Sequence, residues 1–132
     1  MADTVYIVEN GLSVTTDRLL TTPAGNEPKW IHWGIGTTAA TGADTVLESP
    51  GAEARTVGTL TQETITHTND TLQNVGTITC AGAGKAITEC GLFTHLTSTT
   101  GYLYLRATFS AINVNVGDSI QFTIKAQYTH PA

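Results

Sequence analysis

The chain has 132 residues and a formal net charge of -5, and only 13% of its residues are charged, about half the usual fraction. This length fits one domain. The six Lys and Arg residues are scattered along the chain. This excludes the concentrated positive surface that nucleic-acid binding requires. Nucleic acid is therefore not an expected partner. No stretch approaches the roughly 20 apolar residues that span a bilayer, so a membrane is not an expected partner either.

Threonine accounts for about one residue in five. Its branched side chain loses rotamer freedom in helices and packs well on pleated sheets, so the composition predicts an all-β protein. Residues 5–8 and 29–35 are apolar on both faces, as expected of central strands. The start of the chain, residues 1–4, lacks the basic region and apolar run of a secretory signal, which predicts synthesis in the cytoplasm.

Residues 36–54 form the one long stretch without periodicity, with room for no more than a turn of helix around 44–48. Loops of this length in compact domains are usually functional or covered by a partner. Strand-like alternation then returns in segments separated by turn signals. These segments are 56–66, 72–80, 85–95, 101–109, 112–116 and 119–128. The pattern predicts a single domain over 1–132, an antiparallel β-sandwich of the jelly-roll type.

A turn at 96–100 would place Leu92 opposite Leu105 and Phe93 opposite Tyr104. In that register Glu89 and Arg106 are diagonal neighbours on one face, within reach of an ion pair. The same register brings no second carboxylate or histidine beside them. We therefore interpret the pair as a structural clip between strands and not as a catalytic site.

The two cysteines are predicted to be free thiols. A hairpin turn at 81–85 would set Cys90 opposite Gly76 and Cys80 opposite Ala86. Four residues along a strand span roughly 13 Å, beyond the separation that a disulfide tolerates.

Motifs for catalysis, metal or cofactor binding are lacking, and we expect no enzyme activity, cofactor or metal. The four histidines stand apart from one another, and no G-x-S-x-G elbow occurs. Residues 34–39 match G-x-G-x-x-A, but no helix-forming segment follows. A sugar-binding module that uses Trp30 or Trp33 stays open, although at this spacing on a strand the two rings point to opposite faces.

Several segments resemble, in order and spacing, a pattern of small bacteriophage virion proteins. They are ITECGLF at 87–93, LYLRATFSAI at 103–112 and GDSI at 117–120, preceded by WGIGTT at 33–38 and DTVLE at 44–48. Cys90 stands where the pattern usually has a small or aliphatic residue. The likeness covers about two-thirds of the chain, and relatives of this kind occur in capsids and in tails.

The resemblance implies a non-enzymatic capsid decoration, or cement, protein on the exterior of the virion, made in the host cytoplasm. Its implied partners are the major capsid protein and further copies of itself, as a homotrimer. A tail, collar or fibre module, with a receptor or carbohydrate contact, is the alternative. The terminal strand and the long loop supply the candidate interface residues, namely Val5, Tyr6, Ile7, Thr37, Thr38, Asp44 and Leu47.

Overall fold

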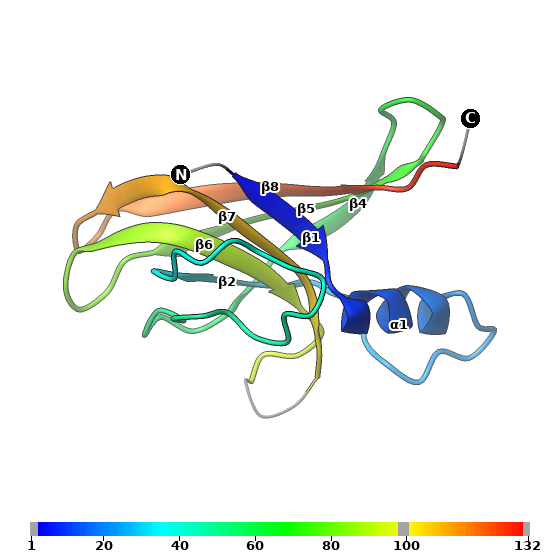
Figure 1. The fold of residues 1–132 in the computed structure, drawn as a ribbon, viewed down its shortest axis with the longest axis horizontal. Helices are drawn as coiled ribbons and strands as arrows, with labels where there is room; N and C mark the ends of the chain where they lie inside the picture. Colours follow the sequence, from blue (N-terminus) through cyan, green and yellow to red (C-terminus); the bar gives the residue numbers. More distant parts are fainter. Residues whose placement is uncertain (1–2, 98–100, 131–132) are drawn as a thin grey trace.

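Two antiparallel sheets pack face to face in the computed structural model, which describes residues 3–97 and 101–130 (Figure 1). Sheet A has the strand order β1-β7-β6-β2-β3, and sheet B has the order β4-β5-β8. The strands of sheet A are β1 (Thr4–Ile7), β2 (Trp30–Gly34), β3 (Thr56–Val57), β6 (Lys85–Phe93) and β7 (Leu103–Val114). Those of sheet B are β4 (Thr59–Glu63), β5 (Thr71–Thr79) and β8 (Ser119–Gln127). The predicted all-β sandwich is confirmed, and its finer jelly-roll topology stays a prediction.

One helix, α1 (Glu9–Arg18), follows β1 directly and was not predicted. Its sequence contains Gly11 and two threonines, all weak helix formers, and Val8 at its start provides no side-chain cap. Two features support it. Glu9 in the first turn and Arg18 in the last turn have the signs that the helix dipole favours, and Gly11 and Val14 are buried. The terminal segment 1–10 is thus a short strand that runs into a helix; its first two residues lie outside the described part.

The strands differ from the predicted ones at three places. β1 is an edge strand of sheet A and not a central one, so Val5 and Tyr6 are half exposed. The segments 101–109 and 112–116 belong to one strand of 12 residues, β7. The segment 56–66 divides at Gly58, where the chain passes from sheet A to sheet B. A Cβ at Gly58 would overlap the side chain of Asn74, so only glycine fits this crossing.

The main core fills the space between the sheets. Its central members are Trp33 and Ile31 from β2, Ile87 and Leu92 from β6, and Phe122 from β8. A second cluster lies where the loop 36–54 covers sheet A, and it joins Leu47 of the loop to Phe93, Leu103, Trp30 and Val8. The loop therefore has an apolar anchor of its own, and it forms no helical turn at 44–48, where the sequence had room for one.

The predicted pairing of β5 with β6 is wrong. The turn at 81–84 leads from sheet B to sheet A, so Cys90 lies opposite Ala107 and Trp33 and not opposite Gly76. Both cysteines are buried and free, as predicted, although the pairing of β5 with β6 behind that prediction does not occur.

The pairing of β6 with β7 follows the predicted register from Glu89 to Leu92. Leu92 lies opposite Leu105 and Glu89 opposite Thr108. The register shifts on both sides of this stretch. A shift between Ile87 and Glu89 sets Ile87 opposite Ile112, and a shift between Leu92 and Phe93 sets Phe93 opposite Leu103 and not opposite Tyr104. Neither irregularity was visible in the alternation of the sequence. Part of the predicted turn, residues 98–100, lies outside the described residues.

Candidate functional site

Glu89 of β6 and Arg106 of β7 form a buried ion pair. Arg106 Nε donates to Glu89 Oε2 at 2.9 Å, and Nη2 lies 2.8 Å from the same oxygen. Glu89 is fully buried, and Arg106 is 2% exposed. The register creates the contact, because Gly91 stands directly opposite Arg106 and leaves room for the guanidinium to reach Glu89 two residues away.

Glu89 also binds the main chain of the long loop. Its Oε1 accepts N–H groups from Gly36 at 3.2 Å and Ser49 at 2.8 Å, and its Oε2 accepts the Glu48 N–H at 3.1 Å. A Cβ at Gly36 would lie 2.8 Å from Glu89 Oε1 and 2.6 Å from Glu48 Cβ. The G-x-G sequence at 34–36 thus has a steric explanation in the approach of the loop to this carboxylate.

The other half of the Arg106 guanidinium binds the loop as well. Nη1 donates to Asp44 Oδ2 at 2.9 Å, and Nη2 donates to the Thr38 carbonyl at 3.0 Å. Burial opposes the charge of Arg106, but the hydrogen bonds and charges of Asp44 and Glu89 outweigh it and raise the pKa of Arg106. Burial alone would raise the pKa of the Asp44 carboxyl. The hydrogen bond from the Thr41 N–H and the contact with Arg106 outweigh this effect and lower the pKa. The charges of the network are therefore satisfied inside the protein.

A further carboxylate orders the surface of the loop. Glu48 Oε1 accepts the N–H groups of Thr37 at 2.8 Å and of Thr38 at 3.2 Å. Hydrogen bonds from Thr38, by its side chain and its N–H, and from the Thr37 N–H lower the pKa of this exposed carboxyl. With Leu47 buried beneath, the loop has a defined shape although it contains no regular secondary structure.

The structure separates the predicted interface residues into two groups. Val5, Tyr6, Thr37 and Thr38 are exposed, and Asp44 is partly so. Leu47 is only 2% exposed and is therefore not a surface residue. Ile7 is partly buried, because it packs against the main core. The apolar character that made Leu47 a candidate instead holds the loop in place.

Sequence reasoning missed a second polar network. Glu53 accepts the Trp33 indole N–H at 2.8 Å and the Ala81 N–H at 2.9 Å, and it forms an ion pair with Lys85. Burial alone would raise the pKa of Glu53, but Lys85 and these donors outweigh it and hold the pKa at about 2. These residues are 20 to 32 positions apart, and no sequence pattern connects them.

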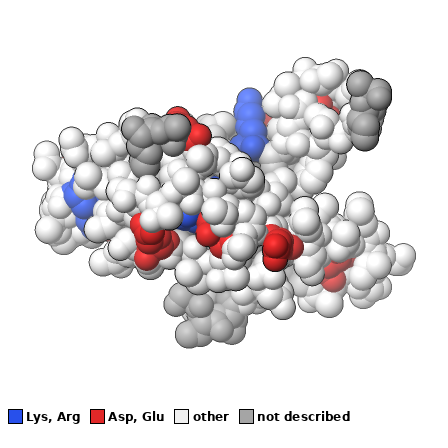
Figure 2. All heavy atoms as spheres, in the orientation of Figure 1, with Lys and Arg blue, Asp and Glu red and all other residues white. Residues whose placement is uncertain are grey.

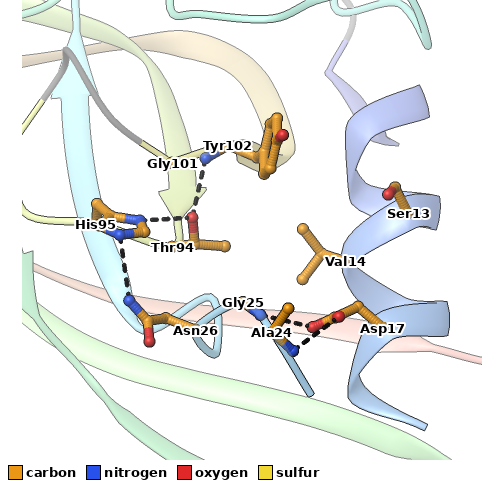
Figure 3. Close-up of a pocket in the computed structure, with 10 residues that line it drawn as sticks. All are labelled: Ser13, Val14, Asp17, Ala24, Gly25, Asn26, Thr94, His95, Gly101 and Tyr102. Atoms are coloured by element: carbon orange, nitrogen blue, oxygen red, sulfur yellow. Dashed lines mark hydrogen bonds between the residues drawn. The ribbon is translucent and has the colours of Figure 1, made fainter. Parts of the chain in front are cut away.

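A pocket of about 510 Å³ lies between α1 and the end of sheet A (Figure 3). Its polar groups mostly bind one another. Both oxygens of Asp17 accept main-chain N–H groups of Ala24 and Gly25, and these bonds lower the pKa of its carboxyl. Asn26 contacts His95 Nε2 at 3.2 Å. Among the described residues, no three His, Cys, Asp or Glu side chains come close enough together to hold a metal ion.

The two tryptophans offer no paired platform for a sugar in the described structure. Trp33 is fully buried in the main core, and Trp30 is half buried against the second cluster. Burial therefore excludes Trp33 from a sugar-binding site, and of the two tryptophans only the partly exposed Trp30 is left for one.

The chain matches no protein-family model, no curated protein and no solved structure. Over residues 3–97 and 101–130, no helix has the length and apolar character needed to cross a bilayer.

Proposed function

We propose that this protein is a non-enzymatic structural component of a bacteriophage particle, a decoration protein that binds the outer shell and stabilises contacts between major capsid subunits. The main support is the Glu89–Arg106 network. It joins the side chains of Glu89, Arg106 and Asp44 and attaches the loop 36–54 to sheet A, so these three charges serve structure. A loop fixed in this way is ready for binding without a further cost of ordering.

The outer surface of the loop has the composition of a contact region. Val46, which is 62% exposed, lines a small hollow together with Thr38 and Arg106. Tyr6 is 50% exposed and pairs with Arg106 across β1 and β7, so both side chains lie on the same face of sheet A. We call Tyr6, Thr38, Val46 and Glu48 the loop face. Exposed aromatic and aliphatic groups with few charges favour burial against another protein.

Low charge over the wider surface supports repeated close packing. In Figure 2, uncharged residues form most of the visible face, and the carboxylates stand in a few separate groups. Contacts between such surfaces leave few charges unpaired, which lowers the cost of desolvation. This suits a protein that binds many equivalent positions on a shell.

The test is retention on particles assembled without the protein and then incubated with purified variants. Val46→Asp places a charge on the loop face and should abolish retention. Val116→Asp is a matched control, because Val116 is 60% exposed and lies in the turn between β7 and β8. Equal retention of the two variants would reject the loop face as the contact.

The number of copies in purified particles separates this proposal from the tail alternative. A decoration protein follows the symmetry of the shell, and hundreds of copies are expected. A few dozen copies or fewer would assign the chain to a tail, collar or fibre instead.

A further inference from the structure

The free edges of sheet B indicate how copies of this chain contact one another. β8 has nine residues, and within the described structure it pairs only with β5. The opposite edge is β4, which also pairs only with β5. Unpaired edges are usually short, charged or covered. β8 is long, and its one charged residue is Lys125.

The hydrogen-bond phase shows which main-chain groups are available. Tyr128 N–H donates to Asp70 O, and Cys80 N–H donates to Asp118 O, so the even-numbered residues of β8 face β5. Since antiparallel pairs alternate, the odd-numbered residues 119–127 direct their N–H and C=O groups away from β5. By the same alternation, Leu60 and Gln62 of β4 direct theirs away from the sheet.

An apolar groove of about 320 Å³ runs beside the free edge of β8. Sheet A has two strands more than sheet B. Residues of β1 and β7 in sheet A line the side of the groove opposite β8. Its lining includes Val5, Ala107, Phe109, Ile112, Phe122 and Ile124. Val5 is 57% exposed there. A further strand beside β8 would extend sheet B, pack against β1 and β7 and bury these side chains.

We propose that β4 of a second copy occupies this position and pairs with β8 in a head-to-tail contact. Within one copy, β4 and β8 both run antiparallel to β5. When the sheets B of two copies lie side by side with their inner faces on the same side, β4 of the second copy therefore runs parallel to β8 of the first. Leu60 of β4 lies opposite the buried Asn74 of β5, so its side chain is on the inner face of sheet B. In the proposed contact Leu60 therefore faces the groove. The connection from β4 to β5 projects beyond the rest of the sandwich, which leaves the end of β4 accessible (Figure 1).

The charges of the two edges are complementary. Glu63 lies at the end of β4 and Lys125 near the end of β8, and among the described residues neither has an ion-pair partner. Within one copy, Glu63 aligns through Thr71 with Gln127, which is two residues from Lys125 on β8. A head-to-tail contact therefore brings Lys125 of one copy close to Glu63 of the next.

This geometry favours a ring over a two-fold dimer. Pairing β8 with β8 of another copy would bring two overhanging β1 strands into the same space and place two Lys125 side chains on one seam. A head-to-tail contact uses two different surfaces and closes into a cyclic oligomer when the rotation between copies permits. The self-association does not depend on binding to a capsid.

Charge reversal tests the contact in purified protein by sedimentation and native mass spectrometry. Lys125→Glu and Glu63→Lys should each raise the dissociation constant about tenfold or more, because like charges then meet across the seam. The double variant restores opposite charges and should restore assembly. Glu9→Lys on α1 makes the same change in net charge as Glu63→Lys, and it should leave assembly unchanged.

A proline on β8 tests the main-chain part of the contact. The Thr123 N–H points away from β5, so Thr123→Pro should keep the fold and block the added strand. Thr123→Val retains the N–H and serves as the control. The proposal predicts an oligomer for the wild type and for Thr123→Val, and monomers for a folded Thr123→Pro. A monomeric wild type up to millimolar concentration, or single charge reversals that leave assembly unchanged, would overturn it.

Discussion

Replacing Glu89 by Gln should strongly destabilise the isolated protein. The carboxylate is fully buried, accepts three main-chain N–H groups of the loop and one hydrogen bond from Arg106 Nε, and forms an ion pair with this guanidinium. An amide at this position presents an NH2 group to donors and leaves Arg106 with less compensation. Breaking a buried pair from one side costs about 3 to 5 kcal/mol.

The magnitude follows from what covers the pair. On an exposed face the same ion pair would contribute about 0.2 to 1 kcal/mol, and burial would then require a partner subunit. The structure places the chain's own loop over the pair, so the larger value applies to the isolated protein. For a domain of this size the midpoint of thermal unfolding should fall by roughly 10 °C or more.

The assay is urea unfolding of Glu89→Gln, Arg106→Met and the double variant, with a double-mutant cycle for the coupling energy. Glu27→Gln is the control, because Glu27 pairs with Lys29 while both side chains stay more than a third exposed. This control should change the free energy of unfolding by about 1 kcal/mol or less. A similarly small effect of Glu89→Gln, or a coupling energy near zero, would refute the argument from burial.

Three further predictions follow. Cys80 and Cys90 should be alkylated only after unfolding, since both thiols are buried. Burial and the charge of Glu89 also raise the pKa of Cys90 to about 12. Mass spectrometry of native and denatured samples after alkylation measures this. The Glu53 pKa of about 2 lies below its ordinary value of 4.5, so its contribution to stability is present above pH 4.5 and lost as the pH falls toward 2. Unfolding of Glu53→Gln at several pH values should therefore show a smaller loss across that window, and an unchanged loss would contradict the assignment. Leu47→Ala should cost about 2 to 5 kcal/mol by urea unfolding, because it empties part of the second cluster; a change below 1 kcal/mol would show that the loop is not anchored there.

The β-strands were predictable because each contains a local signal. Alternation along 119–128 identifies β8, and the same period across 85–109 yields the register that brings Glu89 near Arg106. Helix α1 lacked such a signal, since its threonines and Gly11 favour other conformations and its support comes from packing. The merging of two segments into β7 depends on continuous pairing with β6, which is a tertiary contact.

The candidate site was predictable only in its centre. The cross-strand geometry of a hairpin predicts the pair, but the hydrogen bonds to Gly36, Glu48 and Ser49 join positions about 40 to 53 residues from Glu89. Contacts at that separation leave no periodic trace in one sequence. The same reason explains why Leu47 was assigned to an interface: an apolar residue in a loop looks alike whether it contacts a partner or its own sheet.

The two proposed contacts use different parts of the sandwich, which allows them to fail separately. The loop face covers the outer side of sheet A, whereas the self-contact uses the edges of sheet B and the groove beside β8. Val46→Asp should therefore leave the oligomer intact and abolish retention on particles. Thr123→Pro should dissociate the oligomer and leave the loop face folded, so any loss of retention in this variant measures how much simultaneous binding by several copies adds to the affinity of one.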